Sequence, residues 1–193
     1  HARADDLSRR GLQVPFECIS RADRIDEAIA DRLAEMGCVR LWIGAESGSQ
    51  RVLDRMKRRT AIADVRAKTA LLQARGIEVG MFIMLGFEGE EVEDLAATID
   101  HLVASAPDVF LTTVAYPIKG TAYHDDVADR VESPLPWDQR TDRDLRILGR
   151  RSSRYYRQAT RWVVNEVALR RALAGGSRNP FALGRLWLAA RVG

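Results

Sequence analysis

Polar side chains recur in this sequence around and just after short apolar runs. They are Glu17, Ser20 and Arg21, then Glu46 and Ser47, then the segment Gly86–Glu90, and finally Tyr116 and Lys119. Since the carboxyl ends of parallel strands meet at one edge of a sheet or barrel, we expect these groups to share one mouth. Their acidic, basic and hydroxyl groups suit a zwitterionic, hydroxyl-bearing ligand. A bare phosphate would instead call for glycine-rich backbone amides.

Glu46 is the first candidate for chemistry. The apolar run Val39–Ile43 stops at the turn Gly-Ala-Glu-Ser-Gly, and a helical pattern carrying Val52, Leu53 and Met56 follows at once. This order of strand, loop and helix places Glu46 and Ser47 at the carboxyl end of a strand. Arg58 lies twelve residues beyond Glu46, after that short helix, so the chain can fold it back towards the same mouth.

Each of these residues also has a structural interpretation. Glu46 is a candidate capping carboxylate for the helix over residues 47–56. Arg58 belongs to the cluster Lys57-Arg58-Arg59, and such clusters are usually solvated. Glu17 alternates with apolar neighbours, which is also what an ion pair with Arg21 or Arg40 would produce.

The elements that must position these groups form a repeat. Strands are predicted over residues 14–19, 39–43, 79–85 and 109–115, and helices begin at Asp23 or Asp26, near Thr60, and after Glu90. The regular alternation predicts an α/β fold with parallel strands and right-handed crossovers. Because four strands do not close a barrel, we expect further βα units upstream of His1. Residues 2–11 look like the end of a helix that closes at Gly11.

Composition narrows the function classes. The chain has 30 Lys and Arg against 27 Asp and Glu, a formal net charge of +3, and two cysteines. Cys18 and Cys38 lack metal-ligand spacing and are expected to be small buried side chains in a reduced, cytoplasmic protein. No signal peptide or long apolar span is visible, and none of the three histidines has a ligand partner at a recognisable spacing.

The repeat fades after Pro117. Residues 116–121 are predicted to form a turn, 133–137 a linker, 141–174 one or two basic helices, and 180–192 a last helix. This arginine-rich tail is expected to cap the open side of the fold with a solvated basic face. An alternative is that it lies peripherally on the inner face of a membrane. Nucleic acid is not an expected partner, because no recognised binding motif is present.

Several segments together resemble a known family. They are Phe16–Arg21, Gly37–Arg40, Ile43–Asp54 and Met84–Glu90. The combination of Gly-Ala-Glu-Ser-Gly-Ser with the later Met-Leu-Gly-x-x-Gly-Glu resembles the radical S-adenosylmethionine (SAM) enzymes. It is most similar to the branch that carries an upstream cobalamin-binding domain, of the magnesium-protoporphyrin ester cyclase and hopanoid-modifying type. The resemblance covers roughly residues 12 to 123.

The resemblance implies a partial (βα)6 barrel that holds a 4Fe-4S cluster and SAM, with cobalamin as a further cofactor of this branch. Residues 1–123 would then supply barrel strands three to six, and residues 124–193 a basic helical extension. Glu46 matches the position that hydrogen-bonds SAM, and Arg58 the position that pairs with its carboxylate. Glu17 matches the acidic position near the methionyl amino group. The Met84–Gly89 stretch, with Met84 and Gly86, matches the segment that packs on adenine.

The sequence departs from the family pattern in two ways. The Cys-x-x-x-Cys-x-x-Cys loop that holds the cluster is absent, which we attribute to its lying upstream of His1. In addition, Glu88 stands where the Gly-x-Pro-Gly-Glu turn usually has proline. The implied reaction is cleavage of SAM to a 5′-deoxyadenosyl radical, or cobalamin-assisted methyl transfer, on a small-molecule substrate such as a lipid or tetrapyrrole. The alternative is a cluster-free half-barrel that serves as a binding or scaffold protein.

Overall fold

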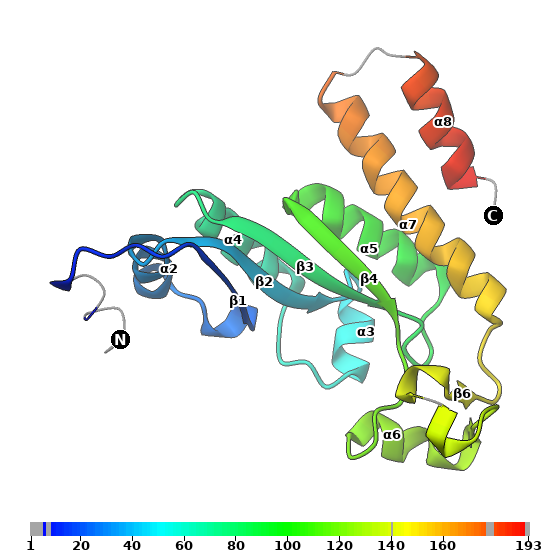
Figure 1. Cartoon of the computed structure of the whole chain (residues 1–193). Helices are drawn as coiled ribbons and strands as arrows, with labels where there is room; N and C mark the ends of the chain where they lie inside the picture. The colour runs from blue at the N-terminus through cyan, green and yellow to red at the C-terminus, as the bar shows by residue number, and fades with distance from the viewer. Residues whose placement is uncertain (1–5, 7–8, 140, 177–179, 192–193) are drawn as a thin grey trace.

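Four strands form one parallel sheet whose order follows the chain. They are β1 (Phe16–Ser20), β2 (Cys38–Glu46), β3 (Glu78–Leu85) and β4 (Val109–Val114). This computed structural model of the 193-residue chain describes residues 6, 9–139, 141–176 and 180–191. The predicted α/β fold with parallel strands is confirmed (Figure 1). Most of the predicted helix over residues 2–11 lies outside the described residues.

Helices connect the strands and cover one face of the sheet (Figure 1). The connections are η1 (Ala22–Arg24) and α2 (Glu27–Glu35), then α3 (Gln50–Arg55) and α4 (Ile62–Gln73), and then α5 (Val92–Ser105). Of the two predicted caps for the first helix, Asp26 is the one used, because its Oδ1 accepts a hydrogen bond from the Ile29 amide at 2.8 Å. The helix predicted to start near Thr60 begins instead after Ala61.

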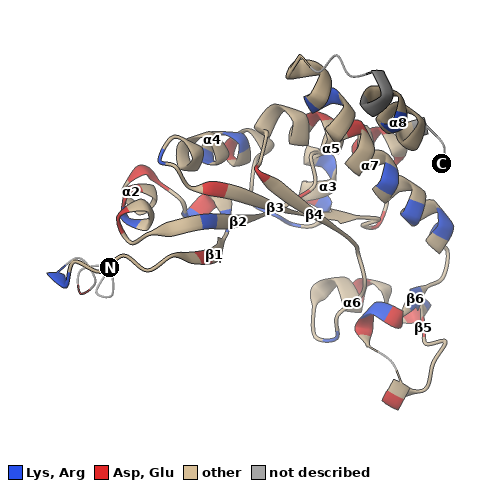
Figure 2. Ribbon diagram, turned by 45° about the horizontal axis from the view of Figure 1, so that its top comes forward, with Lys and Arg blue, Asp and Glu red and all other residues tan. Residues whose placement is uncertain are grey.

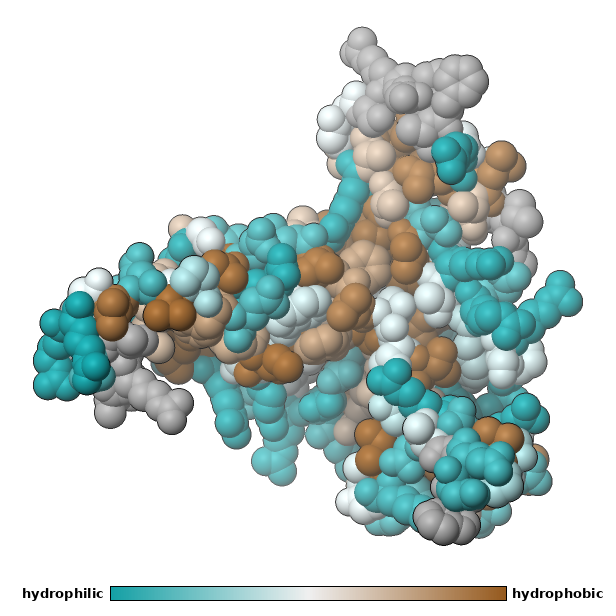
Figure 3. Space-filling view, viewed as in Figure 1, coloured by the Kyte–Doolittle hydropathy of each residue, from teal (hydrophilic) through white to brown (hydrophobic). Residues whose placement is uncertain are grey.

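The two faces of the sheet differ in burial. Along β2, Leu41, Ile43 and Ala45 are buried against the helices, while Arg40 and Trp42 on the opposite face are partly exposed. That opposite face, which we call the open face, includes Ile19 and Leu111, whose exposed fractions are 71% and 52%. In Figure 3 apolar side chains (brown) are visible among hydrophilic ones across the sheet. Strand alternation therefore places one set of side chains in the core and another on an accessible surface.

The chain after β4 agrees with the prediction only in part, because the turn over residues 116–121 is confirmed but helix begins later than residue 141. It forms α6 (Ala122–Val127), η2 (Ala128–Arg130), β5 (Val131–Glu132), η3 (Trp137–Gln139), η4 (Asp142–Asp144) and β6 (Arg146–Ile147), followed by α7 (Ser153–Ala174) and α8 (Pro180–Arg191). The prediction of helix over residues 141–152 is wrong. The amide and the hydroxyl of Thr141 both donate to the Asp144 carboxylate, which favours a turn over a continuous helix. Gly149 has a φ of 79°, which is also incompatible with a helix. The last predicted helix is confirmed as α8.

Helix α7 packs on α5 and shares the core of the sheet. Ala159, Val163 and Val167 belong to the same buried cluster as the strand residues. Arg171 donates to the carbonyls of Leu102 and Pro107 at 2.9 and 3.0 Å, which fixes the far end of α7 to the end of α5. The boundary at residue 123 stays a prediction. Within the described residues, no helix combines the length and apolar character needed to cross a membrane.

Candidate functional site

Glu46 ends β2 in an unusual conformation. The pairing of β2 with β3 shifts register between Gly44 and Glu46, and Glu46 has a φ of 62°. Non-glycine residues rarely adopt this left-handed backbone, and when they do the strain is often found at functional sites. Its carboxylate folds back over the strand, since a Cβ atom added at Gly44 would lie 2.9 Å from Glu46 Oε1. Gly44 therefore leaves the space that the carboxylate fills.

Arg58 reaches the Glu46 carboxylate, as the spacing predicted. The Arg58 Nη2 atom donates to Glu46 Oε1 at 2.6 Å. The return of the chain is set just before Arg58, where Lys57 has a φ of 55° and the Arg58 amide donates to the Leu53 carbonyl at 2.9 Å. Among the described residues, the other N–H groups of the Arg58 guanidinium have no partner. These groups are available to a bound anion.

The electrostatics of the pair are asymmetric. The Glu46 side chain is 11% exposed, whereas that of Arg58 is 42% exposed. Burial raises the pKa of Glu46 above its usual value, and the positive charge of Arg58 opposes this rise. The alternative role of Glu46 as a helix cap is not observed, because Ser49 occupies the N-cap of α3.

The loop after Glu46 is anchored to α5. The Gly48 amide donates to Thr98 Oγ1 at 2.9 Å, and the Ser49 hydroxyl donates to Asp94 Oδ1 at 2.6 Å. Ser47 is 1% exposed, and its Oγ accepts from the Ser49 amide at 3.1 Å. Ser47 is also a candidate contact for the cofactor by its place beside Glu46, and this role stays a prediction; in the structure its hydroxyl bonds within the loop.

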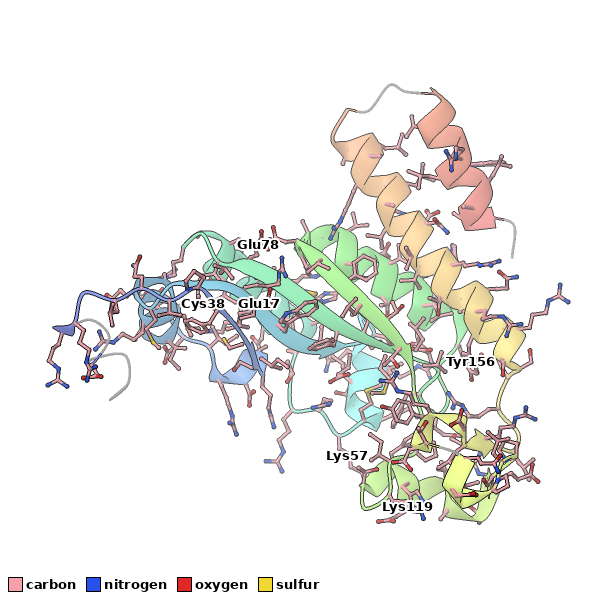
Figure 4. The ribbon with its side chains drawn as sticks, viewed as in Figure 1. Glu17, Cys38, Lys57, Glu78, Lys119 and Tyr156 are labelled. Carbon is pink, nitrogen blue, oxygen red and sulfur yellow. The ribbon has the colours of Figure 1, made fainter. Side chains whose placement is uncertain are left out.

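Glu17 does not join this site. It lies near the amino end of β1 on the open face, where Arg40 Nη1 and Trp42 Nε1 each donate to its carboxylate at 2.8 Å. Arg40 also binds Glu78 of β3, so the three charges form a row across β1, β2 and β3. Figure 4 labels Glu17 and Glu78. Arg40 precedes Glu46 by six residues in β2, a distance of about 20 Å along a strand. Of the two ion pairs proposed for Glu17, the one with Arg40 is confirmed.

Met84 and Gly86 lie at the carboxyl end of β3. Gly86 has a φ of 75°, and an added Cβ atom there would lie 2.4 Å from the Tyr156 ring. Its amide donates to Glu90 Oε2 and its carbonyl accepts from Arg150 Nη2, each at 2.5 Å. Glu88, at the position where proline is usual, pairs with Arg130 at 3.3 Å. An ion pair thus holds this turn without proline.

Glu90 and Asp94 are carboxylates whose contacts near the carboxyl edge of the sheet the sequence did not reveal. Burial raises the pKa of Glu90 to about 7, while its hydrogen bond from the Gly86 amide opposes the rise. Asp94 is 5% exposed and binds both Ser49 and Arg51. The Glu91 amide donates to the Asp94 carboxylate, which forms one half of a capping box at the start of α5. The spacing of Glu91 and Asp94 is the sequence signal from which this contact of Asp94 could have been predicted.

The cysteines do not fit an iron–sulfur cluster. Cys18 in the middle of β1 and Cys38 at the start of β2 lie with their sulfur atoms 3.9 Å apart. Burial raises the pKa of the Cys38 thiol to about 12, which opposes formation of a thiolate ligand. The described residues contain no group of three or more His, Cys, Asp or Glu side chains that could hold a metal ion.

A parallel βα array with a charged pair at its carboxyl edge defines a segment of a TIM-type barrel. The model of the radical SAM superfamily matches residues 2–102. This match covers more than half of the chain, and the chain therefore belongs to the radical SAM superfamily.

One curated relative is an uncharacterized methyltransferase of Pyrococcus horikoshii, 32% identical over 126 residues. The match covers 62% of this chain and 27% of that protein, so the chain spans about a quarter of the relative's length.

Solved structures share the fold. The radical SAM methyltransferase TsrM from Kitasatospora setae, solved with cobalamin and a [4Fe-4S] cluster, superposes with a TM-score of 0.60 at 18% identity, over 68% of this chain and 29% of that one. Coproporphyrinogen III oxidase from Escherichia coli, a radical SAM enzyme, gives a TM-score of 0.54 at 17% identity, over 61% and 28%. At these identities the likeness shows the fold alone.

Proposed function

We propose that this chain forms part of the catalytic barrel of a radical SAM enzyme and that Glu46 and Arg58 hold SAM. The observation that carries the proposal is the buried Glu46 carboxylate, in a left-handed backbone conformation and 2.6 Å from Arg58, at the carboxyl edge of the sheet. The membership of residues 2–102 in the superfamily supports it.

The chemistry of the pair suits this ligand. A carboxylate accepts hydrogen bonds from an ammonium or from ribose hydroxyls, and a guanidinium with free N–H groups binds a carboxylate with two parallel bonds. Met84 and Gly86 end the neighbouring strand, where they would pack on the adenine. When bound, SAM with a 4Fe-4S cluster supplies a 5′-deoxyadenosyl radical or a methyl group. Because the chain has two cysteines, both poorly placed, the cluster's thiolates would come from residues outside it.

The reaction subtype is a finer part of the proposal. The name of the Pyrococcus relative favours methyl transfer over ring closure of the magnesium-protoporphyrin cyclase type, and we propose cobalamin as the cofactor that would assist it. The substrate would be a small molecule, with lipids and tetrapyrroles as the first classes to test.

A second function is favoured by one observation. Helix α8 presents Trp187 and Leu188, whose exposed fractions are 49% and 54%, and aromatic and aliphatic side chains beside arginines are typical of helices that lie on anionic membranes. We propose membrane-surface contact as a role of the tail, either in the enzyme or in a cluster-free binding protein.

Arg58 and its neighbour Arg59 offer a matched test of SAM binding. In the intact protein with its cluster reconstituted, Arg58→Gln should weaken SAM binding at least tenfold in calorimetry, because a charge-assisted contact to the SAM carboxylate is lost. Arg59→Gln removes the same charge one residue away and should change affinity less than twofold. Equal affinities in the two variants would refute the assignment.

A further inference from the structure

A large cavity lies where the end of β4, the segment around β6 and the start of α7 meet. Its volume is about 1000 Å³, and its lining includes six arginines and one acidic residue, Glu132. The arginines are Arg143, Arg146, Arg150, Arg151, Arg157 and Arg161. Figure 2 shows the basic positions (blue) along the first turns of α7. A cavity wall with this excess of positive charge attracts anions.

Three of the six arginines have internal partners. Arg150 donates to the carbonyls of Gly86 and Ala115, and its guanidinium lies 4.9 Å from the centre of the Tyr156 ring. Arg143 lies 5.5 Å from the centre of the Tyr116 ring. Carbonyls and rings leave the positive charge in place, so among these three only Arg151, which pairs with Glu91 at 2.9 Å, is neutralised.

The other three arginines are unpaired within the described part of the chain. Arg146, Arg157 and Arg161 have no carboxylate within ion-pair distance there. Arg157 and Arg161 are four residues apart on α7 and therefore point to the same side of the helix, with Thr160 between them in the lining. By contrast, Arg170 farther along α7 is held by Glu166 and Asp100. Three guanidinium groups with no carboxylate partner among the described residues thus line the cavity.

Neighbouring groups favour oxyanions. Ser153, Thr160 and Tyr156 add hydroxyls to the lining. The first turn of α7, a helix of 22 residues, contains no acidic side chain, so its positive end is not neutralised within that turn. Guanidinium groups bind phosphate and carboxylate through two parallel hydrogen bonds, and the cavity volume is at the upper end for a site of small organic ligands.

We propose that this cavity binds a small organic anion that carries several phosphate or carboxylate groups, and that this anion is the substrate. The second half of the proposal rests on the proposed radical SAM function. The link is structural, because Arg150 and Tyr156 line the cavity and also contact Gly86, which belongs to the segment assigned to adenine (Figure 4 labels Tyr156). An anion held by Arg157 and Arg161 would lie beside the mouth of the barrel.

The test is anion binding to the intact protein at low salt, measured by calorimetry. Pyrophosphate and citrate serve as the phosphate and carboxylate probes, and phosphatidylglycerol vesicles distinguish a lipid headgroup from a soluble anion. We expect saturable binding of at least one soluble probe, weakened at least tenfold in the Arg157→Gln/Arg161→Gln double variant. The control Arg24→Gln/Arg154→Gln removes two exposed arginines outside the cavity and should bind within twofold of the parent.

The outcomes separate cleanly. Absence of soluble-probe binding, or equal loss in both double variants, would overturn the cavity site. Vesicle binding that depends on Arg157 and Arg161, without soluble-probe binding, would also overturn it in favour of a lipid surface. SAM binding by the same variants is the separate readout for the proposed function, since Glu46 and Arg58 are unchanged. Parent-like SAM affinity of the Arg157→Gln/Arg161→Gln variant, together with its loss of probe binding, supports the proposal. If the parent protein binds the probe but not SAM, the cavity site stands and only the role of the anion as substrate is refuted.

Discussion

Glu46 has a strained backbone, a buried carboxylate and a half-exposed partner, Arg58. A carboxylate that served only to stabilise the fold would be expected on a relaxed backbone with better solvation, because both strain and desolvation oppose folding. The geometry instead keeps an acceptor at the strand end and leaves guanidinium N–H groups free beside it. This combination is why Glu46 carries the functional proposal.

The raised pKa of Glu90 predicts how the stability of the protein depends on pH. Its folded-state pKa is raised from 4.5 to about 7, so the folded protein holds this proton more tightly than the unfolded chain. The free energy of unfolding should therefore fall as pH rises from about 4.5 to about 7. Glu90→Gln removes that loss and should stabilise the protein at pH 8 by at most about 3 kcal/mol, with little gain at pH 4.

Urea denaturation at the two pH values checks this expectation. Glu93→Gln changes an exposed carboxylate on the first turn of α5 and should leave the pH profile like that of the parent. A Glu90→Gln variant that gained equally at both pH values, or lost stability at pH 8, would contradict the assigned role of burial.

At the scale of elements, the loop that carries Glu46 depends on close contact with α5. A Cβ atom at Gly48 would lie 2.5 Å from the Ala97 carbonyl oxygen and from the Thr98 Cα. Because these are backbone atoms of a helix, they cannot move aside. Gly48→Ala should therefore lower the free energy of unfolding by roughly 1–3 kcal/mol.

Gly184→Ala is the control for Gly48→Ala in chemical denaturation. Gly184 lies within α8 and has no atom within 4 Å of an added Cβ, so alanine there should be neutral or stabilising by up to about 1 kcal/mol. If Gly48→Ala were equally well tolerated, the loop and α5 would not be packed as described.

The elements also show what sequence patterns can and cannot determine. The apolar run Val79–Leu85 predicted β3 because this signal is local. Arg58 was placed correctly because a short helix and one turn leave few paths for the chain. Glu17 was expected at the mouth with Glu46, but the register of β1 against β2, which the sequence does not set, pairs Glu17 with Arg40, six residues before Glu46.

The C-terminal part was the least predictable. Arginines before α7 favour helix by propensity, but the Thr141–Asp144 capping box and Gly149 direct the chain into turns and the short β6. The arginine-lined cavity could not be foreseen, because its residues come from several elements that meet only in the folded chain.

At the scale of the whole molecule, α7 joins the tail to the barrel segment through a shared core, and α8 packs alongside the far end of α7 (Figure 1). If the tail contacts anionic membranes, Trp187→Ser/Leu188→Ser should reduce co-sedimentation with phosphatidylglycerol vesicles at least fivefold, because inserted apolar area is lost. Leu12→Ser/Val14→Ser changes two exposed apolar residues outside the tail and should have no effect. Unchanged sedimentation of the Trp187/Leu188 variant would argue against the membrane role.

The central claim is that Glu46 holds SAM in a radical SAM enzyme. The most direct test is SAM turnover by the intact protein, reconstituted with iron and sulfide without oxygen and reduced with dithionite, with cobalamin present and absent. We predict 5′-deoxyadenosine or S-adenosylhomocysteine as a product, and at least a hundredfold loss in Glu46→Gln at unchanged iron content, which corresponds to about 2.7 kcal/mol. No product from a fully reconstituted protein, or equal turnover by Glu46→Gln, would contradict the claim.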